Sequence, residues 1–388
     1  MHQYSRHLVA LLVVAAVVAV APAGVAAQPA ESTAGSAFPV TLTDATGTEV
    51  TLDERPERVT TTNPSAAQVM WELDAESQVV GLTQFAHYLE GAETRQNVSS
   101  TELGVSIERV VATEPDLVLA PNATSVETVA TLRDAGLTVY HFSAATDFED
   151  VADKTSTIGR LTGNAQAARE TNAWVDANVE AVSTATADAD RPRLLYPLLG
   201  GFAVGDDTFI TEIIETAGAE NIAADEFDGY EVLNAERVIE LGPDVLLVTD
   251  QTEGQILDSE PYASTPAGRT GSTVSLEVNY INQPAPRSLV YSTRNLTTQL
   301  HPGLYDESDY VSRSEAVATL DGPTSSATGT DGLNTTDVDG PNSTGTDDSN
   351  TPTDESPTGV SAPGFGPVAA VVSLVGGGLL ARRRSGAA

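Results

Sequence analysis

The sequence predicts an α/β protein with two doubly wound, Rossmann-like lobes, joined by one long helix, and a ligand cleft between the lobes. An internal repeat is the first reason, because residues 108–122 read ERVVATEPDLVLAPN and residues 236–250 read ERVIELGPDVLLVTD. In each copy a short helical stretch leads through a proline into an unbroken apolar run, which is typical of a strand buried on both faces of a parallel sheet. The second reason is that strand-like and helical segments alternate on both sides of the alanine-rich stretch 165–186.

The first lobe is expected over residues 38–164. It opens with a β-hairpin, because alternating residues flank the turn sequence DATG at positions 44–47. Short runs rich in β-branched residues then alternate with helical segments. In addition to the strand of the first repeat copy, we expect strands at residues 58–62, 79–83 and 138–142, and helices at residues 65–73 and 126–135.

A single long helix is expected over residues 165–186, because this stretch has no proline or glycine and is rich in alanine. Such a helical strut permits only a small change in lobe orientation when a ligand binds. The second lobe follows over residues 187–312. Its expected elements are strands at residues 193–196, 245–248 and 273–276, and a helix at residues 208–217.

Acidic residues dominate the charge, since 55 Asp and Glu against 19 Lys and Arg give a formal net charge of −36. A nucleic-acid partner is excluded, because such a surface repels phosphates. Lys154 is the only lysine. An acidic surface almost free of lysine resembles the surfaces of proteins from extreme halophiles, where molar salt shortens the Debye length to about 3 Å. The chain has no cysteine, which excludes disulfides, thiolate metal sites and a lipidated N-terminal cysteine.

Two segments outside the lobes have the composition of a targeting signal and a linker. Residues 1–27 combine basic residues, a short apolar run and small residues, which predicts a secretory signal peptide. A retained N-terminal membrane helix is the alternative, although the run is shorter than a typical span. Residues 321–362 are rich in Thr, Ser, Asp, Gly and Pro and have almost nothing to bury, so we expect a disordered stalk.

The last segment, residues 363–384, begins with Pro-Gly-Phe, continues as an apolar stretch and ends in three arginines. It resembles the C-terminal sorting signal of archaeal surface proteins, which implies that an archaeosortase removes the helix and attaches a lipid. A plain transmembrane anchor is the alternative. The arginines belong on the cytoplasmic side in both cases, so we expect an exported protein, anchored at its C-terminus on the extracellular face of the cell membrane.

Five sequons are candidate glycosylation sites of an exported protein. Those in the body of the chain are expected on loops, and the other two lie in the stalk. The five asparagines are Asn97, Asn122, Asn295, Asn334 and Asn342.

The order of these parts resembles a known family. The hairpin, the stretch RVTTTNPSAAQVMWELDAESQVVGLTQF, the two ERV…PD repeats, the long helix and the segment YINQPAPRSLV…LHPGLY occur in this order over residues 38–305. Together they resemble the substrate-binding proteins of ABC importers for vitamin B12, ferric siderophores and haem. The resemblance implies a monomeric two-lobed clamp without a cofactor. It also implies that the clamp holds a metal chelate in its cleft and delivers it to a membrane permease with ATPase subunits.

The cleft should be lined by the loops that follow the strands, because ligands of open α/β sheets bind outside the carboxyl ends of strands. Those loops are residues 62–65, 84–88, 120–122, 197–207, 227–230, 249–251 and 279–283. Aromatic faces there could pack against a flat macrocycle, whereas ordinary core packing is the alternative. The candidate ligand-binding residues are Phe85, His87, Tyr88, Phe202, Phe227, Tyr230 and Tyr280.

His87 could coordinate the cobalt or iron of a chelate, but a lone histidine supplies one ligand, so no site for a naked metal is expected. Asp206 and Asp207 could bind a cation, but we expect them to cap the helix that follows. The resemblance also implies that a surface glutamate on the first helix of each lobe pairs with permease arginines. Glu212 matches the second of these, whereas Gln68 stands at the first place and Glu72, one turn later, could substitute. Simple solvation of both glutamates is the alternative.

An enzyme is not expected, because the chain lacks the GxSxG, HExxH and Walker lysine motifs. Among ligands, a corrinoid such as cobalamin is favoured over a ferric siderophore or haem, because the expected cleft is short of arginines for an anionic chelate. Arg287 is the only nearby one, and its Pro-Arg motif favours a structural role. A structural or adhesive cell-surface glycoprotein remains the alternative from another class.

Overall fold

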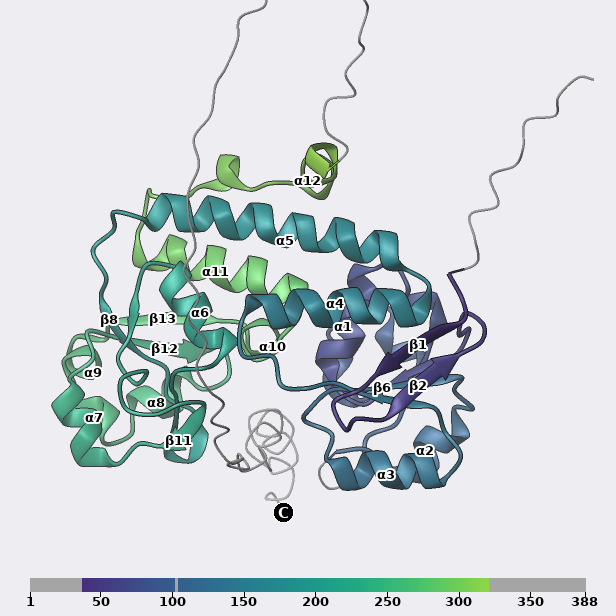
Figure 1. Ribbon diagram of the computed structural model, residues 1–388. Helices are drawn as coiled ribbons and strands as arrows, with labels where there is room; N and C mark the ends of the chain where they lie inside the picture. The colour runs from purple at the N-terminus through teal and green to yellow at the C-terminus, as the bar shows by residue number, and fades with distance from the viewer. Residues whose placement is uncertain (1–36, 102–103, 321–388) are drawn as a thin grey trace, which may run out of the picture. The chain divides into compact units, whose positions relative to one another are not determined.

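The computed structural model describes residues 37–101 and 104–320 (Figure 1). The expected signal peptide (1–27), stalk (321–362) and sorting segment (363–384) lie outside these residues, as do Asn334 and Asn342. The described part contains two parallel sheets with helices packed around each. This is the α/β fold class that the sequence predicts.

The first sheet has five parallel strands in the order β5–β4–β3–β6–β7. Strand β6 (Leu117–Ala120) is the apolar run of the first repeat copy, and all four of its residues are buried, as expected for a strand covered on both faces. The expected hairpin is also present, formed by antiparallel strands β1 (Val40–Thr43) and β2 (Glu49–Leu52). The other strands of the sheet are β3 (Val59–Thr61), β4 (Val79–Leu82), β5 (Gln96–Asn97) and β7 (Val139–His141).

The second sheet has four parallel strands in the order β10–β8–β12–β13. Strand β12 (Val245–Thr249) is the apolar run of the second repeat copy, and it lies in the interior of the sheet. A separate antiparallel pair consists of β9 (Phe202–Val204) and β11 (Tyr230–Val232). The other strands of the sheet are β8 (Arg193–Leu195), β10 (Glu220–Asn221) and β13 (Thr273–Leu276).

Helices connect the parallel strands within each lobe. In the first lobe they are α1 (Pro64–Glu72), α2 (Ile107–Ala112), α3 (Val126–Asp134) and α4 (Phe148–Thr162). The second lobe contains α6 (Phe209–Thr216), α7 (Ala235–Leu241), α8 (Glu253–Leu257), α9 (Pro266–Thr270), α10 (Val278–Ile281) and α11 (Pro286–Leu300), and α12 (Arg313–Leu320) follows. Short 3₁₀ turns lie at Glu76–Gln78, Gln84–Ala86, Ala92–Thr94, Leu199–Gly201, Tyr262–Ser264 and Glu307–Asp309.

The long helix α5 (Ala165–Thr186) has the bounds expected from its composition. Helices α4, α11 and α12 pack against it (Figure 1). Trp174 and Asn178 lie on its buried face, where they are 2% and 1% exposed. Asn178 exchanges two hydrogen bonds with the backbone of Val311, at 2.9 and 3.1 Å. Residues from several parts of the chain therefore converge on this one helix.

Helices α4 and α11, each of 15 residues, were not expected from the sequence. Their buried faces contain hydroxyl side chains, which hide the apolar periodicity of a packed helix. Thr293 donates to the Leu289 carbonyl at 2.7 Å, and Thr297 donates to the Thr293 carbonyl at 2.9 Å. A buried hydroxyl is satisfied when it bonds to the carbonyl one turn earlier, so it can replace an aliphatic residue in the helix interface.

Candidate ligand-binding site

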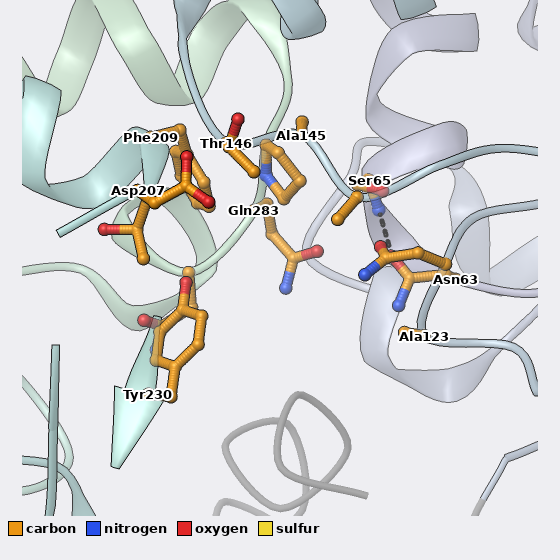
Figure 2. Close-up of a pocket in the computed structure, with 14 residues that line it drawn as sticks. Asn63, Ser65, Ala123, Ala145, Thr146, Asp207, Phe209, Tyr230 and Gln283 are labelled. Carbon is orange, nitrogen blue, oxygen red and sulfur yellow. Dashed lines mark hydrogen bonds between the residues drawn. The ribbon is translucent and has the colours of Figure 1, made fainter. Parts of the chain in front are cut away.

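One pocket is lined by residues from both lobes, beside the carboxyl ends of several strands (Figure 2). Its volume is about 90 Å³. The first lobe contributes the loops after β3, β6 and β7, and the second contributes residues before and in α6, strand β11 and the segment after α10. The lining residues are Asn63, Ser65, Asn122, Ala123, Ala144, Ala145, Thr146, Asp207, Thr208, Phe209, Tyr230, Asn282, Gln283 and Pro284.

The wall from the first lobe is built around the amino end of α1. Asn63 has an extended backbone, with φ −149° and ψ 147°, and its Oδ1 accepts a hydrogen bond from the Ser65 N–H at 2.9 Å (Figure 2). This bond caps the helix, whose first N–H groups have no intrahelical partner. The cap thereby fixes the carboxamide of Asn63 at the wall of the pocket.

The wall from the second lobe begins just before α6. Thr208 is the N-cap of this helix, because its Oγ1 accepts a hydrogen bond from the Thr211 N–H at 3.1 Å. The expectation that Asp206 and Asp207 cap the helix is therefore wrong, since the Thr208 hydroxyl already binds the free N–H group. Asp207 is exposed and lines the pocket beside Phe209 (Figure 2).

Tyr230 and the segment 282–284 complete the pocket. Tyr230 lies on β11, where it pairs with Val204 of β9, and burial raises the pKa of its phenol. Asn282 Oδ1 accepts a hydrogen bond from the Tyr196 hydroxyl at 3.1 Å. Gln283 is only 7% exposed, and Figure 2 shows its carboxamide between the two walls.

Nearly all of this lining is uncharged, with four carboxamides beside apolar side chains. Asp207 is the one acidic side chain among the described lining residues, which include no Lys, Arg or His. Neutral hydrogen-bond donors and acceptors suit an uncharged ligand, whereas recognition of carboxylates or phosphates normally uses guanidinium groups. The carboxamides are those of Asn63, Asn122, Asn282 and Gln283.

Of the seven residues predicted to bind the ligand, Tyr230 lines this pocket and the other six lie outside its lining. Tyr88 and Tyr280 pack edge to face, with ring centroids 6.2 Å apart, and Tyr280 packs in the same way on Tyr291 at 5.4 Å. His87 is exposed. The half-buried rings that pack elsewhere are Phe85, Phe202 and Phe227. Ligand contact by these six residues stays a prediction.

Sequence reasoning passed over the carboxamides, although they stand in or beside loops that it assigned to the cleft. The prediction rested on aromatic side chains, whereas Asn and Gln are common in any loop, so composition alone does not single out these carboxamides. Residues 144–146 were missed for another reason. They follow the expected strand 138–142, so the rule that was applied to the other strands would have found them.

Comparison with known proteins identifies the family of this chain. A family model described as periplasmic binding protein matches residues 59–279. The chain belongs to the periplasmic binding protein family. A cobalamin-binding protein of Halobacterium salinarum is 44% identical over 304 residues, which cover 74% of this chain and 82% of that protein. An uncharacterized ABC transporter substrate-binding lipoprotein of Bacillus subtilis is 25% identical, over 70% of this chain and 88% of that protein.

Solved structures show the same fold. The periplasmic heme-binding protein RhuT from Roseiflexus sp. RS-1 superimposes with a TM-score of 0.57 and 26% identity, over 63% of this chain and 98% of that one. The molybdate periplasmic binding protein MolA of Haemophilus influenzae gives a TM-score of 0.62 at 20% identity, over 72% and 95% of the two chains. The relatives are binding proteins of transporters, so the prediction that this chain is not an enzyme is confirmed.

In this periplasmic binding protein, Gln68 and Glu72 do not lie on the surface, contrary to the expectation for permease docking. They are 0% and 5% exposed. The Gln68 carboxamide donates to the Tyr88 hydroxyl at 2.8 Å and accepts from the Ser288 N–H at 3.2 Å. The bond from Ser288 joins α1 to the start of α11, so the Gln68 side chain is engaged inside the protein.

Glu72 is held in the same interface by two ion pairs, with Arg287 and Arg313. Burial raises the pKa of Glu72, and the two arginines act in the opposite direction. The Arg313 guanidinium also lies over the Trp174 ring, 4.4 Å from its centroid. Because both arginines already neutralise the carboxylate, Glu72 is not available to a permease. The structural role expected for Arg287 is consistent with this pairing.

Glu212 is half-buried in the first turn of α6, and its carboxylate accepts a hydrogen bond from the Phe148 N–H at 2.6 Å. Burial raises its pKa, partly offset by that bond. Glu212 therefore supports the amino end of α4, and docking through it stays a prediction.

Lys154 is buried in α4, where its ammonium donates to the Pro284 carbonyl. Burial lowers its pKa to about 7. The side chain also borders a second cavity of about 280 Å³, which shares Ala144 and Ala145 with the pocket described above. The sole lysine of the protein thus connects α4 to the segment that carries Gln283.

The sequons within the described residues differ in their surroundings. Asn97 is exposed on β5, and Asn295 is exposed on α11, so the expectation of a loop is wrong at both positions. Asn122 lines the candidate ligand-binding pocket. A glycan there would occupy the space of a ligand, so glycosylation of Asn122 and ligand binding are sterically incompatible.

Two kinds of feature are absent from the described residues. No group of three or more His, Cys, Asp or Glu side chains could hold a metal ion. No helix in the described part of the chain is long and apolar enough to cross a membrane.

Proposed function

We propose that this protein is an exported, C-terminally anchored receptor that captures a corrinoid such as cobalamin and delivers it to the permease of an ABC importer. The observation that carries the corrinoid is the carboxamide-lined pocket, whose described lining includes one acidic and no cationic side chain. Corrinoids carry a rim of carboxamide groups. Carboxamides of protein and ligand can donate to and accept from each other, so the chemistry of the two surfaces matches.

Haem and ferric siderophores fit this lining less well. The propionates of haem and the acidic groups of most ferric siderophores are anionic, and proteins bind such groups with Arg or Lys. The nearby Arg287 is paired with Glu72 and does not line the pocket. The relative with 44% identity, which is named a cobalamin-binding protein, supports the same choice.

The size of the pocket limits how a corrinoid binds. About 90 Å³ is well below the volume of typical small-molecule sites, which is about 300–1,000 Å³. A corrinoid would therefore fill this pocket with one edge only and extend across its mouth. A movement of the lobes or of their loops on binding would enlarge the contact.

Equilibrium dialysis of the purified full-length protein in molar KCl tests the ligand. We expect saturable binding of cyanocobalamin at one site per chain, and much weaker binding of haemin and of an anionic ferric siderophore. Absorbance of the coloured ligands reports binding directly, and albumin serves as a control for non-specific uptake. If the protein prefers either anionic chelate, the proposed ligand changes from a corrinoid to a ferric siderophore or haem. Absence of binding to all three would reject the receptor and favour a structural surface glycoprotein.

Export and anchoring are separate parts of the proposal. They are supported by the composition of residues 1–27 and 363–384. Mass spectrometry of the mature protein from membranes tests both, because we expect no peptide from either segment and a lipid at the new C-terminus. Recovery of the intact apolar C-terminal peptide would favour the plain transmembrane anchor.

A further inference from the structure

Asp207 is the exception in an otherwise neutral pocket. It is the one charged side chain among the described lining residues, and it is exposed. Figure 2 shows it on the wall formed by the second lobe, between Phe209 and Tyr230. Its expected role as a helix cap is taken by Thr208. The carboxylate therefore has no structural function in the cap that would explain its presence.

The backbone of Asp207 adds a second, independent observation. Its φ is +55°, in the left-handed region that glycine adopts without strain. Asp74 and Glu114, the other non-glycine residues with positive φ in the described structure, follow the carboxyl ends of α1 and α2, where this conformation is common. Asp207 instead precedes the first turn of a helix. Asp adopts this conformation more readily than most residues, but glycine would adopt it without strain, so a carboxylate kept here supports the hypothesis of a function.

The loop that carries Asp207 is held firmly in place. The Gly205 N–H donates to the Gly229 carbonyl at 2.7 Å, and the Asp206 N–H donates to the Phe227 carbonyl at 2.9 Å. The Gly229 N–H returns a bond to the Asp206 carbonyl at 2.6 Å. A Cβ at Gly205 would lie 2.1 Å from the Phe227 carbonyl oxygen, so the two segments are in direct contact. The carboxylate is therefore presented from a fixed position rather than from a loose loop.

We propose that Asp207 determines the specificity of the pocket: its carboxylate accepts hydrogen bonds from N–H groups of a neutral or cationic ligand and excludes anionic chelates. This inference rests on the proposed function, because it concerns the same pocket. The opposite wall holds Asn63 and Asn122, which can donate as well as accept. A ligand that presents N–H groups to Asp207 and carbonyl groups to those carboxamides is oriented in the pocket.

Three single variants separate the carboxylate from its surroundings. Asp207→Asn removes the charge, keeps the size and tolerates positive φ. Asp207→Gly removes the side chain and the backbone strain. Asp206→Asn is the matched control, because it removes the charge next in sequence, which is also exposed but lies outside the pocket lining. Each full-length variant is dialysed in molar KCl against cyanocobalamin, which has no net charge, and against an anionic ferric tris-catecholate siderophore.

We expect Asp207→Asn to bind cyanocobalamin about tenfold more weakly, since a charge-assisted hydrogen bond is replaced by a neutral one. Its affinity for the siderophore should rise, so that the preference for cyanocobalamin falls by more than about tenfold. Asp207→Gly should lose the preference as well, and its melting temperature should equal or exceed that of the unchanged protein. Asp206→Asn should keep the preference within about twofold.

The outcomes distinguish this inference from the proposed function. If the unchanged protein prefers cyanocobalamin and Asp207→Asn keeps the same preference, Asp207 is not the specificity residue although the corrinoid receptor stands. If Asp206→Asn changes the preference as much as Asp207→Asn, the effect is one of general charge and the inference is overturned. If the unchanged protein binds the anionic siderophore more tightly, both the inference and the proposed ligand are wrong.

Discussion

Single buried polar residues hold the two lobes together. Gln68 and Glu72 lie one turn apart on α1, and both bind residues at the start of α11, more than 200 positions later in the chain. Arg313, the first residue of α12, reaches the same carboxylate. A buried carboxylate is stable only when opposite charges compensate it, so Glu72 ties together three segments that are far apart in sequence.

We expect Glu72→Gln to lower the free energy of unfolding by about 3 kcal/mol, because it leaves two arginines without their shared partner. This loss of unfolding free energy lies near the lower end of the range for breaking a buried ion pair, because the Arg287 and Arg313 side chains are 30% and 40% exposed. Urea unfolding in molar KCl measures it, with the exposed Glu93→Gln as the control. A loss equal to that of the control would contradict a central role for Glu72.

Lys154 should make stability depend on pH in a defined window. Burial lowers its pKa from 10.5 to about 7 in the folded protein, so the unfolded chain binds more protons between these two values. Stability should therefore rise with pH across this window, by about 1.4 kcal/mol per unit for this group. Below pH 7 both states are protonated and the contribution of Lys154 is constant.

The variant Lys154→Met isolates this effect, since it has no amine to titrate. The difference in unfolding free energy between the variant and the unchanged protein should be largest near pH 6 and shrink toward pH 10. Tyrosines that titrate at high pH contribute equally to both proteins and cancel. A difference that stays constant with pH would show that the ammonium remains charged throughout.

At the scale of elements, the repeat places the same residue types on both lobes. Glu108 and Glu236 stand in the first turns of α2 and α7, and both are exposed. One turn later in each helix, Val111 and Ile239 are also exposed, at 38% and 43%. A matching acid and aliphatic residue on each lobe would suit a permease that presents two similar surfaces.

Charge reversal compares this pair with Glu212. We expect the double variant Glu108→Lys, Glu236→Lys to abolish ligand uptake by cells while affinity for the ligand in solution stays unchanged. Glu212→Lys should do the same if Glu212 docks. If Glu212→Lys instead lowers both uptake and affinity, its bond to the Phe148 N–H is structural and the docking prediction is wrong. Full uptake by the double variant would show that Glu108 and Glu236 are not needed for docking to the permease.

The elements also show where sequence patterns succeed. Strands β6 and β12 were expected from unbroken apolar runs, and α5 from a long stretch without helix breakers. Helices α4 and α11 were not predicted, because buried Thr and Ser replace aliphatic residues on their packed faces. Hydrophobic periodicity detects a helix only when burial is achieved with apolar side chains.

At the scale of the whole molecule, the net charge of −36 predicts dependence on salt. Repulsion among the carboxylates opposes the compact state in dilute buffer and is screened as ionic strength rises. We expect the melting temperature to rise steadily as KCl increases from millimolar to molar concentrations, as measured by circular dichroism. Sucrose solutions of matched water activity are the control for non-ionic effects. A melting temperature independent of KCl would mean that the surface charge is already balanced by local contacts.

The sequence by itself determined the fold class, most of the strands and helices, and most of the loops that surround the pocket. These features depend on local patterns: apolar runs, helix breakers, turn residues and a repeat. Only the tertiary structure decided which side chains meet. It placed Gln68 and Glu72 in the interior, gave the helix cap to Thr208 and left Asp207 facing the pocket. The physical reason is that burial and pairing depend on residues hundreds of positions away, such as Arg287 and Ser288, and no local pattern records those contacts.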